Sequence, residues 1–84
     1  MSGLKRHESE VNKLNKPLFR SFMVKYGDTQ QTLADAMNIS LSRLNAKINS
    51  NGAEFTQLEI AFIKNRYNLS AEEVDAIFFA KEVS

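Results

Sequence analysis

The segment that decides the fold reads QQTLADAMNISLSRLNAKIN and spans Gln30–Asn49. It predicts two short helices, over about 30–37 and 41–49, joined by a sharp turn. Two such helices cross at roughly 90–120°, and a close crossing needs a small side chain, which Ala34 supplies. Asn38 suits the turn, because asparagine tolerates the left-handed backbone region.

An apolar core is expected where these two helices meet. The side chains predicted to be buried together are Leu33, Ala34, Met37, Ile39, Leu44, Ile48 and Ile63. Ser40 is the predicted N-cap of the second helix, since a serine hydroxyl accepts a hydrogen bond from a free N–H of the first turn. This cap lets the start of the second helix face outward. Because Leu44 and Ile48 must be buried, the side chains expected to point away from the core are Leu41, Ser42, Asn45 and Ala46, with Arg43 and Lys47 flanking them.

The residues before the segment predict a helix over about 17–26. Pro17 suits a first helical turn, and apolar side chains follow it at helical spacing. Gly27 ends this helix, because glycine readily adopts positive φ. Residues 1–15 are polar and weakly patterned, so they fit a polar N-terminal arm and a short helix equally well. The folded domain is assigned to residues 16–84.

Two capping boxes predict two helices after the segment. Thr56 and Glu59 stand three residues apart, and Ser70 and Glu73 repeat the pattern. The side chains expected to face inward are Leu58, Ile60, Phe62 and Ile63 on the fourth helix and Val74, Ile77 and Phe78 on the fifth. No stretch of strand length alternates between apolar and polar residues. The predicted fold class is therefore all-α, a compact domain of five helices.

Composition excludes several classes of protein. A chain of 84 residues fits one domain. It has no cysteine and a single histidine, His7, so we expect no metal site and no cofactor. There is no nucleophile–base pair and no glycine-rich phosphate loop, which argues against an enzyme. A small-molecule ligand is not expected either, because a chain of this length offers no second, ligand-sensing domain. No apolar run approaches the roughly 20 residues that span a bilayer, so a cytoplasmic protein without membrane contact is expected.

Charge is unevenly distributed along the chain. Residues 1–53 hold eight Lys and Arg against four Asp and Glu, whereas residues 54–84 hold three against six. One interpretation is that a basic face meets a polyanion. The other is a chance fluctuation in a small protein.

The motif Gln-x-x-Leu-Ala-x-x-x-x-Ile-Ser-x-x-x-Leu, which begins at Gln30, resembles the helix-turn-helix of the lambdoid-repressor and Cro family. This is the broad repressor-like class of phage and bacterial proteins, and the resemblance covers about residues 17–79. Two positions depart from it, since Asn38 and Ser50 stand where the family often has glycine. Neither breaks the fold, because asparagine tolerates the turn and Gly52 lies close by.

The resemblance implies a five-helix domain that binds double-stranded DNA in a sequence-specific manner, as a small phage or mobile-element transcriptional regulator does. The second helix of the motif would then enter the major groove. The positions implied to contact bases are Leu41, Ser42, Asn45 and Ala46. Among them, Asn45 has the chemistry for a bidentate contact to adenine, and an apolar side chain can touch a thymine methyl.

A second set of residues is implied to contact phosphate: Gln30, Arg43, Lys47, Asn49 and Asn51. Arg43 can also form a bidentate contact with guanine, although its angle on the helix favours a contact with phosphate. Asn49 and Asn51 fit ordinary turn chemistry equally well.

Repressor-like domains usually bind two half-sites as dimers, so a weak homodimer is expected. The residues expected at its contact are Phe78, Phe79 and Val83. Adjacent Phe78 and Phe79 diverge by about 100° on a helix, so one of them should be partly exposed. The alternative function is a protein-binding helix-turn-helix module, such as an antirepressor that acts on a larger partner. The acidic fifth helix, with Glu72, Glu73 and Asp75, suits that alternative.

Overall fold

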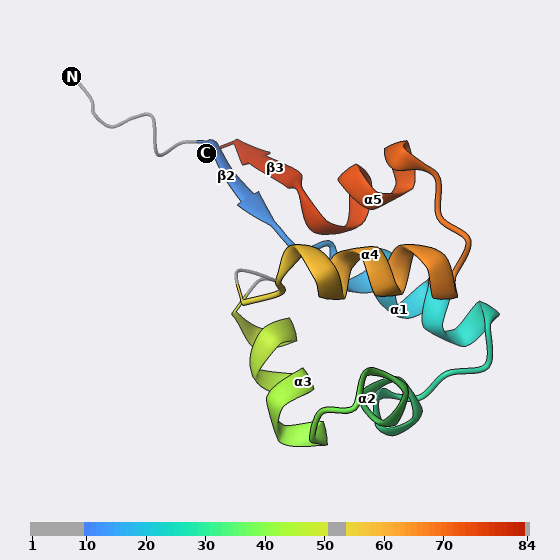
Figure 1. Ribbon diagram of the computed structural model, residues 1–84. Coiled ribbons are helices and arrows are strands. Elements are labelled where there is room, and N and C mark those ends of the chain that lie inside the picture. Colours follow the sequence, from blue (N-terminus) through green and yellow to red (C-terminus); the bar gives the residue numbers. More distant parts are fainter. Residues whose placement is uncertain (1–9, 51–53, 84) are drawn as a thin grey trace.

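Seven short elements make up the part of the chain that the structure describes. This computed structural model describes residues 10–50 and 54–83, with side chains for 13–50 and 54–80. In chain order, the elements are β2 (Glu10–Lys13), α1 (Lys16–Lys25), α2 (Gln30–Met37), α3 (Leu41–Asn49), α4 (Gln57–Arg66), α5 (Ala71–Phe78) and β3 (Ala80–Val83). The five predicted helices are all present. In Figure 1, α2 and α3 lie on one side of α4, and α5 and the strands lie on the other.

Local hydrogen bonds explain where these helices begin and end. The Thr56 hydroxyl accepts a hydrogen bond from the Glu59 N–H, and the Glu59 carboxylate accepts one from the Thr56 N–H. Ser70 and Glu73 form the same pair of bonds at the start of α5. Gly27 follows α1 with a φ of 76°. Both predicted capping boxes and the glycine stop are confirmed.

The turn between α2 and α3 depends on one left-handed residue. Asn38 has φ 62° and ψ 40°, as its sequence position predicted. Beside it, the Ile39 N–H donates to the Ala34 carbonyl over 3.0 Å, and the Asn38 N–H donates to the Asp35 carbonyl over 3.1 Å. These bonds satisfy carbonyls that the end of α2 would otherwise leave free.

This geometry predicts the effect of substitutions at Asn38. Asn38→Gly should change the free energy of unfolding by about 1 kcal/mol or less, because glycine takes positive φ without strain but loosens the unfolded chain. Asn38→Val should destabilise by more than about 1 kcal/mol, since a β-branched residue resists this conformation. Urea denaturation measures both changes. A valine variant as stable as the parent would contradict the left-handed turn.

Two short strands were not predicted, and they correct the interpretation of residues 1–15. Glu10–Lys13 is neither arm nor helix but forms β2, which pairs antiparallel with β3, from Glu10 opposite Val83 to Lys13 opposite Ala80. The Asn15 N–H extends this link by donating to the Ile77 carbonyl over 2.7 Å. The partners stand at opposite ends of the chain, so nothing local in either strand indicates the pairing.

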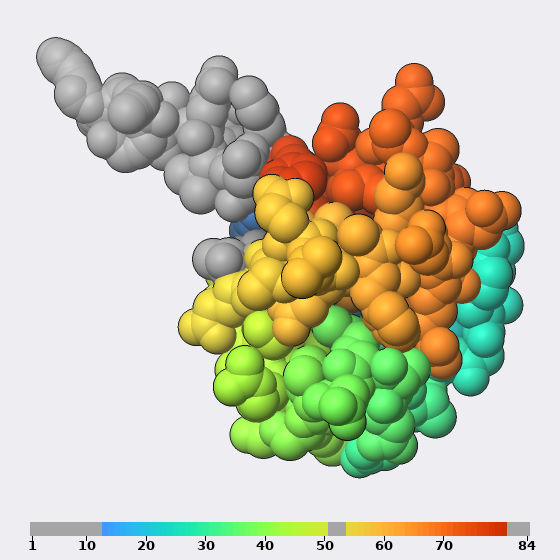
Figure 2. Space-filling model, in the orientation of Figure 1, coloured from blue at the N-terminus to red at the C-terminus, as the bar shows by residue number. Residues whose placement is uncertain are grey.

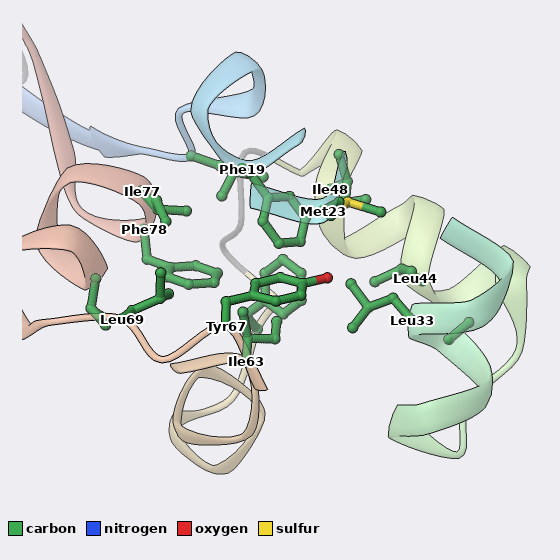
Figure 3. Close-up of a cluster of buried hydrophobic side chains, with 14 residues drawn as sticks. Phe19, Met23, Leu33, Leu44, Ile48, Ile63, Tyr67, Leu69, Ile77 and Phe78 are labelled. Atoms are coloured by element: carbon green, nitrogen blue, oxygen red, sulfur yellow. The ribbon is translucent and has the colours of Figure 1, made fainter. Parts of the chain in front are cut away.

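The hydrophobic core joins the helices across the centre of the molecule (Figure 3). Five of the side chains predicted to be buried together are indeed buried: Leu33, Ala34, Leu44, Ile48 and Ile63. The other two, Met37 and Ile39, are only partly buried and pack against the edge of the core. Three further aromatic rings meet there: Phe55 lies 6.2 Å from Phe19 and 5.4 Å from Phe78, between ring centroids.

The inward face predicted for α4 is wrong in part. Ile63 is buried and Ile60 partly so, but Leu58 is 84% exposed and Phe62 is 38% exposed. Apolar residues on this helix cover more than one face, and a helix can turn only one face to the core. The buried face of α4 continues into Tyr67, which has no exposed surface.

Candidate nucleic-acid interface

The outward face of α3 carries the side chains that the sequence assigned to base contacts. Ser42 and Ala46 are exposed and stand one turn apart, and Leu41 and Asn45 beside them are half-buried. The opposite face of the helix is formed by Leu44, Lys47 and Ile48, which are buried. The residues predicted to contact bases therefore share one accessible surface.

The N-terminus of α3 is closed by its predicted cap. The Ser40 hydroxyl accepts a hydrogen bond from the Arg43 N–H over 3.1 Å. The Arg43 side chain is exposed on the same helix. It remains a candidate for contact with phosphate or guanine.

Lys47 corrects the predicted phosphate contacts. It is only 4% exposed, and its Nζ lies 3.1 Å from Glu59 Oε1. The same amine donates to the Glu54 carbonyl over 3.0 Å. A buried cation that already has two partners does not reach a phosphate outside, because leaving them would strand the Glu59 carboxylate. Sequence spacing placed Lys47 beside the outward face, and the packing of α3 on α4 turns it inward.

Two of the remaining predicted phosphate contacts lie at helix ends. Gln30 is the first residue of α2 and is half-buried, and Asn49 is exposed as the last residue of α3. These two and Arg43 stay candidates. Asn51 lies outside the described residues.

Sequence reasoning missed a polar cluster around Asp28. Its carboxylate accepts two hydrogen bonds from Arg66, over 2.7 and 2.8 Å, and one from the Tyr67 hydroxyl over 2.7 Å. Thr32 adds a fourth, over 2.9 Å, and its oxygen in turn accepts the Thr29 N–H. The cluster therefore joins the capped start of α2 to the end of α4. Arg66 and Tyr67 stand 38 and 39 residues from Asp28 in the chain, so no local pattern signals their contact with it.

The electrostatics of this cluster follow from its hydrogen bonds. The Arg66 guanidinium holds the pKa of Asp28 well below its usual range, with help from Tyr67 and Thr32 and against the effect of burial. Burial, and the bond to Asp28, raise the pKa of the Tyr67 hydroxyl well above its ordinary value. Asp28 is therefore a carboxylate, and Tyr67 a neutral donor, at physiological pH.

The expected dimer contact is corrected at one position. Phe78 is 5% exposed and belongs to the core, so it cannot form a contact between copies. Phe79, next to it, is 37% exposed, as the divergence of neighbouring helical residues predicted. The side chain of Val83 lies outside the described residues.

An apolar surface that the sequence did not predict lies between α2 and α4. A shallow hollow of about 190 Å³ is lined by Ala36, Met37, Leu58, Glu59 and Phe62. Leu58 is the most exposed of its large apolar side chains. Figure 2 shows the face of the molecule on which α4 lies above α2.

Two features that other classes of protein would need are absent from the described residues. Across 10–50 and 54–83, no three His, Cys, Asp or Glu side chains gather as a metal site would require. No helix in the same ranges has the length and apolar character to cross a membrane. In the comparisons with known proteins, no family model, curated protein or solved structure matches the chain.

Proposed function

We propose that this protein binds double-stranded DNA in a sequence-specific manner and places α3 in the major groove, as a small transcriptional regulator of the repressor and Cro type. The observation that carries the proposal is the outward face of α3, where Ser42, Asn45 and Ala46 are accessible while the opposite face is packed. An α-helix with its side chains is about 10–12 Å across, which suits a major groove about 12 Å wide.

Different side chains of this surface would contact the bases and the phosphates. Asn45 offers an amide that can bond adenine with two hydrogen bonds, and Leu41 and Ala46 offer apolar contact to thymine methyl groups. Arg43 supplies positive charge to the backbone, with Gln30 and Asn49 at the flanking helix ends. Because Lys47 is paired with Glu59, Arg43 is the cation that α3 presents to DNA.

Selection from a pool of randomised duplexes, followed by titration at several salt concentrations, tests the proposal. Arg43→Ala should weaken binding to all duplexes alike and reduce the salt slope by about one, because one phosphate contact is lost. Asn45→Ala should cost about 1–3 kcal/mol on the selected duplex and relax the preference at one base pair. Two half-sites about ten base pairs apart would show that two copies bind.

Lys64→Ala is the matched control, since Lys64 is exposed on α4 rather than α3. It should leave the sequence preference unchanged. If Arg43→Ala alters the preference and Asn45→Ala does not, the assignment of the two side chains is reversed. A parent protein that binds no duplex at low salt would overturn the proposal.

The second candidate function is a protein-binding module, such as an antirepressor. The hollow between α2 and α4 favours it, because exposed apolar side chains such as Leu58 and Phe62 are typical of protein contacts. Loss of partner binding in Leu58→Ser, with no effect of Arg43→Ala, would support this function.

A further inference from the structure

The last turn of α3 and the first turn of α4 share one carboxylate oxygen. Glu59 Oε1 accepts the Thr56 N–H over 3.0 Å, which caps α4, and the same atom lies 3.1 Å from Lys47 Nζ. Lys47 Nζ also donates to the Glu54 carbonyl, just before α4. A single acidic side chain therefore both begins α4 and connects it to α3.

This connection is largely removed from solvent. The Lys47 side chain is 6% exposed and that of Glu59 is 20% exposed. An ion pair in such a place is directional, because each charge must keep its hydrogen-bonding partners. These contacts fix the position of Lys47 relative to the start of α4. We call the Lys47–Glu59 ion pair a polar tie between α3 and α4.

The tie lies on the side of α3 that faces away from the proposed DNA. Lys47 is buried with Leu44 and Ile48, while Ser42 and Ala46 point outward. Each residue of a helix turns about 100° relative to the last, so a small rotation of α3 about its axis changes which side chains meet the base edges. Apolar contacts alone permit such a rotation more readily than a hydrogen-bonded ion pair does.

We propose that Glu59 is a positioning residue for DNA recognition. By holding Lys47, it sets the rotation of α3 about the helix axis. The inference rests on the proposed function. A second polar tie, from Asp28 to Arg66, holds the start of α2 against the other end of α4. The two ties lie at opposite ends of a helix about 15 Å long, so α4 acts as a rigid support for both α2 and α3.

Glu59→Ala tests the proposal, with Glu73→Ala as its matched control. Each variant removes the carboxylate of a capping box at the same position of its helix, but the structure shows no ion pair of Glu73 with another described residue. The measurement is the ratio of affinities for a duplex selected by the parent and a scrambled duplex of equal composition. The affinities are measured at a temperature at which circular dichroism shows that the parent and each variant are folded.

Glu59→Ala should lower this ratio about tenfold, whereas Glu73→Ala should keep it within about twofold of the parent. The double variant Lys47→Met/Glu59→Ala removes the unpaired amine and keeps an apolar chain of similar length. It should regain thermal stability relative to Glu59→Ala but not the affinity ratio. It also serves as the test variant if Glu59→Ala does not fold.

Two results would overturn the inference while leaving the proposed function intact. The first is a Glu59→Ala protein that distinguishes the two duplexes as well as the parent does. The second is a double variant that regains the affinity ratio together with its stability, which would reduce Glu59 to a structural role. A parent that does not distinguish the duplexes would instead refute sequence-specific binding itself, and the inference with it.

Discussion

Ala34→Glu is expected to unfold the protein. Ala34 has no exposed surface and lies in the core with Leu33 and Leu44, where α2 packs on α3. A carboxylate there has no partner, and an unpaired buried charge costs several kcal/mol. A domain of this size has a stability of only about 5–15 kcal/mol, and small domains fall at the low end. The far-ultraviolet circular dichroism of the variant should therefore show loss of helix at 25 °C.

Ala36→Glu is the matched control for this substitution. Ala36 stands two residues later on the same helix and is exposed. Glutamate there should change the free energy of unfolding by about 0.5 kcal/mol or less. A cooperative thermal transition in Ala34→Glu, close to that of the control, would contradict the close approach of α2 and α3.

Asp28→Asn is expected to have the second largest effect, a loss of about 2–4 kcal/mol at neutral pH. The Asp28 side chain is 5% exposed and accepts four hydrogen bonds, two of them from Arg66. The substitution removes the charge that pairs with Arg66 and replaces one accepting oxygen by a donor. Chemical denaturation of parent and variant measures the difference.

The pH dependence provides a further test of Asp28. Its pKa lies well below that of an aspartate in the unfolded chain, which is about 3.9. The stabilisation is therefore complete above that unfolded value and declines as the pH falls toward the folded value, because the unfolded state binds the proton first. The parent should lose stability between about pH 5 and pH 2, and Asp28→Asn should lose less over the same interval.

Asp35→Asn is the control for both measurements, since Asp35 is exposed on α2 and bonds Gln31 alone among the described side chains. It should change stability at neutral pH by about 0.5 kcal/mol or less. Equal acid sensitivity in the parent and in Asp28→Asn would show that the cluster does not control stability in this range.

The candidate interface was predicted unevenly from the sequence. Helical periodicity identified Ser42 and Ala46 as outward and Leu44 and Ile48 as inward, and burial confirms both pairs. Periodicity failed at Lys47, because a lysine between two inward positions reads as a solvated charge unless its partner is known. That partner, Glu59, belongs to another helix, where its sequence context indicated only a helix cap.

The sequence by itself determined much of the local structure of this protein: the presence of five helices, the caps at Ser40, Thr56 and Ser70, and the left-handed turn at Asn38. These features depend on hydrogen bonds between residues a few positions apart and on the conformational preference of single residues, so the information lies within each segment. Only the tertiary structure decided the pairing of β2 with β3, the burial of Lys47 and the cluster at Asp28. Each of these joins groups that are far apart in the chain, and it depends on how the helices rotate and pack against one another, which no single segment encodes.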